Sequence, residues 1–160
     1  MGEFHRMHMK DKNYNHMKKK IAIGNDHAGT MLKLKIFTFL ESKGYLMNNC
    51  GTDSDQSVDY PDYAHHVAKL VQEQEADLSI LICGSAQGVS ITANKHNDIR
   101  AAVCWNQKIA ELARQHNNAN VLCLPARFLS IEAAIEIVEV FLVTGFEGGR
   151  HQTRIDKINV

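Results

Sequence analysis

The segment from Leu78 to Ser90 constrains the fold of this chain most, because an apolar run stops there in a small, glycine-containing turn. Its sequence is Leu-Ser-Ile-Leu-Ile-Cys-Gly-Ser-Ala-Gln-Gly-Val-Ser. The apolar part is too short for a membrane span and too β-branched for a stable helix, so it predicts a buried central strand of a parallel sheet. Residues 89–93 can then begin a helix.

Cys83 stands at the carboxyl end of this predicted strand, where open α/β sheets commonly carry their chemistry. The turn matches neither the dinucleotide-binding nor the Walker pattern, so it does not indicate nucleotide binding. Taken alone, Cys83 is more often a buried apolar residue than a base. The residues after it are small enough for backbone N–H groups to point at an anion or oxyanion: Gly84, Ser85, Ala86, Gln87 and Gly88.

Strands and helices alternate along the whole chain. In the helix predicted after the first strand, Leu32, Ile36 and Leu40 form the apolar face, whereas Lys33 is expected elsewhere around the helix. Five β-α units predict an α/β protein, a three-layer α/β/α Rossmann-like fold with a five-stranded parallel sheet. The expected strands are 21–24, 45–49, 78–83, 101–104 and 121–124, and the expected helices are 30–43, 59–71, 89–95, 106–118 and 130–144, with a short one at the C-terminus.

Composition predicts one domain without a charged partner. The 160 residues are 44% hydrophobic, enough for a single core over residues 17–160, and the polar, aperiodic residues 1–16 are expected to form a disordered tail. Eighteen basic and eighteen acidic residues give no net field that would attract nucleic acid or an anionic membrane.

Membrane insertion, disulfides and metal binding are not predicted either. No apolar run approaches the roughly 20 residues that a membrane-spanning helix needs. The four cysteines form no Cys-x-x-Cys pair, which fits a reducing cytoplasm. His5, His8 and His16 lack the cysteine or carboxylate spacing of a metal site, so the sequence predicts none.

Polar residues follow several of the predicted strands, and topology would bring them to one edge of the sheet. Such a set suits proton transfer next to a carbonyl on a phosphorylated substrate. Each member also has a structural interpretation, as a helix cap, a surface histidine or a solvated arginine face. Besides Cys83 and its turn, the candidates are Asp26, His27, His116, Arg127, Arg150 and Arg154.

Eight short motifs follow one another along the chain. They are Gly-Asn-Asp-His-Ala-Gly (24–29), Gly-Thr (51–52), Asp-Tyr-Pro-Asp-Tyr-Ala (59–64), Ile-Cys-Gly-Ser-Ala-Gln-Gly (82–88), Ala-Asn-Lys (93–95), Arg-Gln-His-Asn (114–117), Asn-Val-Leu (120–122) and Glu-Gly-Gly-Arg-His-x-x-Arg (147–154). Together they give the chain a resemblance to type B ribose-5-phosphate isomerases over residues 18 to about 158. The resemblance implies interconversion of ribose 5-phosphate and ribulose 5-phosphate, a step of the pentose phosphate pathway, without metal or organic cofactor. It also implies a homodimer or homotetramer, and the strand order 2-1-3-5-4.

The resemblance also implies roles for individual residues. Cys83 would be the base that moves a proton between C1 and C2, with Ser85 assisting, and the amides of 84–88 would hold the enediolate. His116 would open the furanose ring. His116, Asn117 and Arg127 would reach into the neighbouring subunit's site, whereas Cys83 and Arg150 would serve their own. Asp26 and Asn117 would contact the sugar or enediolate, and the phosphate would be bound by His27, Arg127, Arg150 and Arg154.

The chain departs from this family's cysteine branch at two positions: Ser85 is usually threonine there, and Ala86 is often glycine. Serine keeps the hydroxyl, but Ala86 restricts the backbone of the turn. Two alternatives remain open, an isomerase of a six-carbon sugar phosphate such as galactose 6-phosphate or allose 6-phosphate, and a non-catalytic sugar-phosphate-binding protein.

Overall fold

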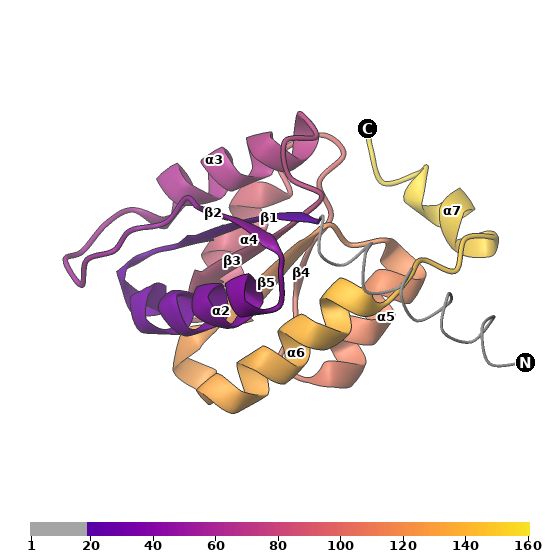
Figure 1. Ribbon diagram of the computed structural model, residues 1–160. Coiled ribbons are helices and arrows are strands. Elements are labelled where there is room, and N and C mark those ends of the chain that lie inside the picture. Colours follow the sequence, from indigo (N-terminus) through magenta and orange to yellow (C-terminus); the bar gives the residue numbers. More distant parts are fainter. Residues whose placement is uncertain (1–18) are drawn as a thin grey trace, which may run out of the picture.

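The structure is a computed structural model that describes residues 19–160, so the expected tail and the first two residues of the predicted domain lie outside the described part (Figure 1). The strands are β1 (Lys20–Asn25), β2 (Leu46–Asn49), β3 (Leu78–Cys83), β4 (Ala101–Val103) and β5 (Val121–Pro125). The helices are α2 (Thr30–Ser42), α3 (Tyr60–Gln72), α4 (Gln87–Ala93), α5 (Gln107–Asn117), α6 (Ile131–Val143) and α7 (Arg150–Ile155), with short 3-10 turns η1 (His27–Gly29) and η2 (Ala126–Phe128).

All strand pairs are parallel, and the sheet order is β2-β1-β3-β5-β4. Both the five-stranded sheet and the order implied by the resemblance are therefore confirmed. Ile80 pairs with Ile23 on one side and with Leu122 on the other, which puts β3 at the centre. Every residue of β3 is buried, including the polar Ser79, as its mainly apolar sequence predicts.

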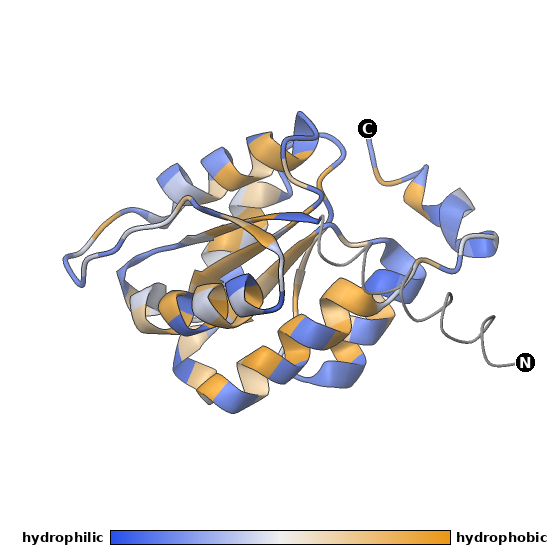
Figure 2. Ribbon diagram, in the orientation of Figure 1, coloured by the Kyte–Doolittle hydropathy of each residue, from blue (hydrophilic) through white to orange (hydrophobic). Residues whose placement is uncertain are grey.

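Side-chain alternation along the strands builds two cores, one on each face of the sheet (Figures 1 and 2). Ile80 and Ile82 pack in the larger core with α2, α5 and α6, whereas Leu81 and Cys83 face the smaller core with α3 and α4. Phe141 is the largest side chain that is completely buried in the larger core. Within residues 19–160, none of the helices combines the length and the hydropathy that crossing a lipid bilayer requires.

One helix face differs from the sequence-based prediction. In α2, Lys33 is buried rather than turned to solvent, with only 2% of its surface exposed. In α5, Ala110 and Ala113 are the buried residues, whereas Ile109 and Leu112 are only half-buried. Small residues let α5 pack closely on its neighbours, and periodicity alone favours the larger side chains.

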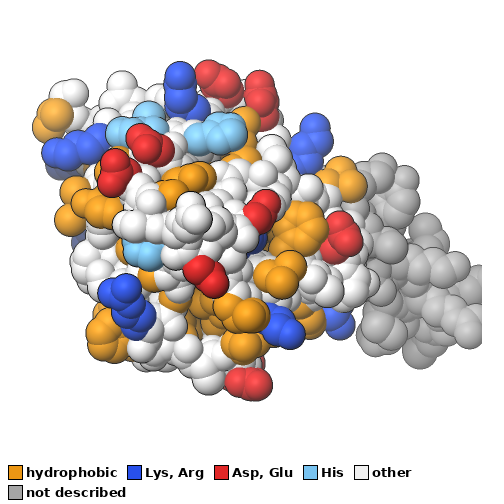
Figure 3. Space-filling model, turned by 90° about the vertical axis from the view of Figure 1, so that its left-hand side faces the viewer, with side chains coloured by type: hydrophobic (Ala, Val, Ile, Leu, Met, Phe, Trp, Pro, Cys, Tyr) orange, Lys and Arg blue, Asp and Glu red, His pale blue; other side chains and the backbone are white. Residues whose placement is uncertain are grey.

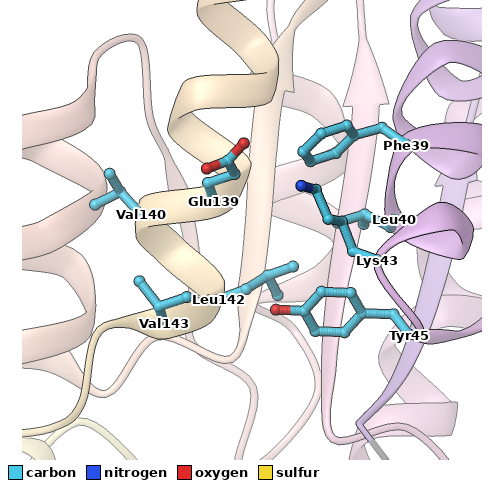
Figure 4. Close-up of a pocket in the computed structure, with 8 residues that line it drawn as sticks. All are labelled: Phe39, Leu40, Lys43, Tyr45, Glu139, Val140, Leu142 and Val143. Carbon is cyan, nitrogen blue, oxygen red and sulfur yellow. The ribbon is translucent and has the colours of Figure 1, made fainter. Parts of the chain in front are cut away.

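A groove with a volume of about 330 Å³ lies between α2 and α6 (Figure 4). Phe39 from α2 and Lys43, which directly follows α2, face Glu139 from α6 across it, and the Lys43 ammonium lies 5.4 Å from the centroid of the Phe39 ring. None of the candidate site residues lines this groove. The candidate chemistry therefore lies elsewhere, at the ends of the strands.

Candidate active site

The carboxyl ends of β1, β3 and β5 bring one group of the predicted residues together. Asp26 donates its backbone N–H to Ile82 O at 3.1 Å, so it lies beside the residue that precedes Cys83. Cys83 pairs with Pro125 at the end of β5, and only 5% of its surface is exposed. The face onto which these strands open carries acidic, basic and histidine side chains among hydrophobic ones (Figure 3).

Arg127 lies directly on the turn that follows Cys83. Its backbone N–H donates to Gly84 O at 3.1 Å, and a Cβ added to Gly84 would lie 2.9 Å from Arg127 Nη1. Only glycine therefore lets the guanidinium approach the turn this closely. This contact puts Arg127 beside the turn that follows Cys83 of its own chain.

The turn itself adopts the shape expected of a glycine. Ala86 has φ of 65° and ψ of −4°, a left-handed conformation that alanine adopts only at a cost of about 1–2 kcal/mol. Ala86 therefore stands at a position whose backbone conformation favours glycine. Ser85 is exposed, and its Oγ accepts a hydrogen bond from Gln87 N at 3.4 Å.

Tyr60 covers the far side of the turn and was not predicted from the sequence. A Cβ added to Gly88 would lie 2.5 Å from Tyr60 Cζ, so the ring packs on that glycine. Its position at the start of α3, in the motif 59–64, was the available signal.

Asp26 and His27 are both held by backbone groups. Asp26 Oδ1 accepts a hydrogen bond from Ala28 N at 2.9 Å, which confirms the helix-cap interpretation and leaves Oδ2 available to a ligand. His27 Nδ1 accepts from Val58 N at 3.2 Å. In the neutral ring Nε2 therefore carries the proton, so His27 presents a hydrogen-bond donor.

The buried Lys33 explains how the long loop 50–57 is attached to this edge. Lys33 Nζ donates to Thr52 O at 2.9 Å and to Asn49 Oδ1 at 3.1 Å, and it also pairs with Asp53. Asn25 Nδ2 donates to the same Thr52 carbonyl at 3.1 Å. The ammonium group thereby fixes the loop to the residue that precedes Asp26.

We expect Lys33→Met to lower the free energy of unfolding by about 2 kcal/mol, because it removes a charged donor from buried acceptors. Urea titration of the full chain measures this loss. Lys35→Met, at an exposed position of the same helix, is the matched control and should change stability by less than about 0.5 kcal/mol. Equal effects of the two substitutions would show that the buried ammonium contributes nothing.

The second group of predicted residues lies at the opposite edge of the sheet. His116 and Asn117 end α5, and Asn117 O accepts a hydrogen bond at 3.0 Å from Nε of Arg100, which directly precedes β4. Cys83 instead lies level with Pro125, the last residue of β5. From Val121 to Pro125, β5 rises by four residues at about 3.3 Å each, so the two edges are about 13 Å apart. The expectation that His116 joins Cys83 at one edge of one chain is therefore wrong.

Arg150 and Arg154 are placed with His116 rather than with Cys83. Both lie on α7, which packs on α5 (Figure 1), and Glu147 N donates to Gln115 O at 3.1 Å. Each chain thus carries two separate groups of candidate residues. We name them the thiol half-site, formed by Asp26, His27, the turn 83–88 and Arg127, and the histidine half-site, formed by His116, Asn117, Arg150 and Arg154.

Two further residues join the histidine half-site without having been predicted. The rings of His116 and His151 stack with centroids 4.3 Å apart and an interplanar angle of 10°. Glu147 Oε2 lies 3.9 Å from His116 Nε2 and 3.6 Å from His151 Nε2. The spacing of Glu147 and His151 in the sequence was the available signal, but it does not reveal that α7 packs on α5.

Known proteins with the same fold match almost the whole described chain. Residues 21–158 match the family model described as Ribose/Galactose Isomerase. The chain is 46% identical to ribose-5-phosphate isomerase B of Escherichia coli over 88% of its own length and 94% of that protein. It is also 46% identical to a Rickettsia conorii protein assigned as a sugar phosphate isomerase without a named sugar, over 86% and 96% of the two chains.

A solved structure agrees with this relationship. The crystal structure of a ribose 5-phosphate isomerase from Thermotoga maritima superposes with a TM-score of 0.86 at 51% identity, covering 88% of this chain and 97% of that one. Family match, sequence identity and fold point the same way. The chain belongs to the ribose/galactose isomerase family of sugar phosphate isomerases.

Proposed function

We propose that the protein interconverts ribose 5-phosphate and ribulose 5-phosphate through an enediolate. The observation that carries the proposal is Cys83 at the end of the central strand, beside a turn with backbone amides and the Arg127 guanidinium. The relatives named for this activity support the choice of substrate.

The thiol half-site supplies the groups for proton transfer. The Cys83 thiolate removes the proton from C2 of the open-chain aldose. The C–H electron pair forms the C1=C2 bond, and the pair of the carbonyl bond moves to O1 to give the enediolate. A proton then passes from the O2 hydroxyl to O1, C2 becomes the carbonyl carbon, and the same thiol returns its proton to C1, which yields the ketose. Ser85 Oγ and the amides of 84–88 stabilise the negative oxygen, and Asp26 holds a sugar hydroxyl.

The histidine half-site of a second copy completes the site. One chain keeps His116 and Cys83 at opposite edges of the sheet, so a two-fold dimer, alone or within a tetramer, is the arrangement that brings them together. His116 then opens the furanose ring by moving a proton between the ring oxygen and O1, and Asn117 contacts the sugar. Arg150 and Arg154 of that copy join His27 and Arg127 on the phosphate, and water is excluded.

The identity of the sugar is tested by comparing purified protein on matched substrates. We expect kcat/KM for ribose 5-phosphate to exceed that for galactose 6-phosphate or allose 6-phosphate by at least about tenfold, because an extra CHOH group must fit the same closed pocket. Isomerase activity on a six-carbon sugar phosphate with none on ribose 5-phosphate would replace the proposed substrate. Binding without turnover of any of them would favour the non-catalytic alternative.

The contact of Arg127 with Gly84 allows a test of phosphate binding. We expect Gly84→Ala to raise KM for ribose 5-phosphate at least about tenfold with little loss of stability, because the new methyl group displaces a flexible guanidinium. Steady-state kinetics and urea titration measure the two effects. In an Arg127→Ala background the same substitution should add little, and Gly145→Ala, which meets nothing within 4 Å, is the control. An unchanged KM in Gly84→Ala would contradict this role of Arg127.

A further inference from the structure

Three metal-binding side chains converge in the histidine half-site, and the isomerisation proposed above uses only one of them. His116, Glu147 and His151 each offer a ligand atom, and these atoms lie within 4.8 Å of one another. They come from the end of α5, from the segment before α7 and from α7 itself. Two imidazoles with one carboxylate are a ligand set that zinc accepts in proteins.

The distances are close to those of a metal site. Zinc bonds to nitrogen and oxygen of about 2.0–2.1 Å put neighbouring ligand atoms of a tetrahedral site about 3.3 Å apart. The Glu147 Oε2 distances of 3.6 Å and 3.9 Å to the two imidazoles exceed this value by about 0.3 and 0.6 Å. The two imidazole rings, which stack at an interplanar angle of 10°, must turn so that both nitrogens point at one ion. The side chains of His116 and Glu147 are 39% and 51% exposed, so they have room to make that adjustment.

Charge and protonation set the conditions for binding. Burial is the main cause that lowers the pKa of His151, followed by the nearby His116 and Arg150, and Glu147 acts in the opposite direction. Arg150 and Arg154 also repel a cation, which limits the affinity.

We propose that His116, Glu147 and His151 bind a divalent transition metal ion of the zinc class, and that the bound ion inhibits the enzyme by occupying His116 Nε2. The binding itself rests on the geometry of the three side chains. The inhibition rests on the proposed function, in which the same nitrogen transfers a proton during ring opening. The ion would also tie α7 to α5.

Binding is tested with Zn²⁺ by calorimetry and with Co²⁺ by visible absorption, both on the full chain. We expect one ion per chain, and an affinity at least about tenfold weaker in Glu147→Gln and in His151→Ala. Cys83→Ala should bind the ion unchanged, which excludes the thiol as its ligand. His65→Ala is the matched control, because His65 is not one of the three clustered ligands and contacts His96 instead, with 2.7 Å between ring nitrogens. Binding that survives Glu147→Gln and His151→Ala, or disappears in Cys83→Ala, would overturn the site.

Inhibition is tested separately, by measuring isomerisation at increasing Zn²⁺. We expect activity to fall with the same affinity as binding, to return when a chelator is added, and to require at least about tenfold more Zn²⁺ in His151→Ala. Full activity with the site saturated would overturn the inhibitory half and count against the role of His116. Because binding is measured independently, failure of the metal site and failure of the proposed function give different results.

Discussion

Cys83→Ala is expected to lower kcat for ribose 5-phosphate isomerisation by about 10²-fold to 10⁴-fold, the contribution typical of a general base. The substitution removes the only proposed group that can carry a proton between C2 and C1. Exchange of the substrate C2 proton with solvent should fall by the same factor. Inhibition by inorganic phosphate should stay nearly unchanged, because His27 and the arginines remain. Cys50→Ala, at a buried thiol of the loop after β2, is the control and should retain activity.

Alkylation of the native protein provides an independent check on the same residue. Burial raises the pKa of the Cys104 thiol to about 12, and it also raises the pKa values of Cys50 and Cys123. Those three thiols stay protonated at neutral pH and react slowly with iodoacetamide. We therefore expect activity to be lost as one thiol per chain, Cys83, is modified, and substrate to protect it. Near-normal proton exchange in Cys83→Ala would contradict the assignment of the base.

The fold followed from the sequence because its signals are local. Alternation of Ile80, Leu81 and Ile82 between two cores requires only a buried strand with helices on both faces. The order of the strands came from the resemblance, since the pattern of β and α units does not fix it. Cys83 and its turn could be predicted as a candidate site because the sequence itself shows an apolar run that ends at small residues.

The grouping of the site residues depends on distances that the sequence does not contain. His116 lies near the end of α5, a helix that runs back along the sheet from the carboxyl ends of the strands. The direction of α5, and not the residues next to His116 in the chain, therefore decides at which edge of the sheet His116 lies. Arg150 lies on the same side of the molecule as His116 because α7 packs on α5. That packing joins two segments that are separate in the sequence, so the sequence does not reveal it. Lys33 was misplaced because a charged side chain is rarely buried unless a loop supplies acceptors, and those acceptors lie 16 to 20 residues away.

The division into two half-sites leads to the second large expected effect. Cys83→Ala and His116→Ala proteins should each be nearly inactive, yet activity should return when the two are unfolded together and refolded as an equal mixture. Random pairing makes about half of the dimers mixed, and each mixed dimer holds one intact site and one doubly damaged site. About a quarter of the wild-type activity is therefore expected. No recovery, with mixed dimers demonstrated by mass, would contradict the shared site.

The same experiment tests where the arginines belong. Arg150→Ala lies in the histidine half-site, so mixing it with Cys83→Ala should give more activity than either protein alone. Arg127→Ala lies in the same half-site as Cys83, so its mixture with Cys83→Ala should give no such gain, because every site then lacks one of the two groups. Recovery in the Arg127 mixture would place Arg127 in the partner's site instead.

Isomerisation in deuterated water tests the central claim most directly. Purified protein is incubated with ribose 5-phosphate in D₂O, and the products are followed by NMR. The proposed mechanism predicts that ribulose 5-phosphate accumulates and that solvent deuterium enters at C1 of the ketose and, on reversal, at C2 of the aldose, in wild type but not in Cys83→Ala. Substrate that remains unconverted and free of deuterium, in protein shown to be folded, would contradict the claim that this chain is a ribose 5-phosphate isomerase.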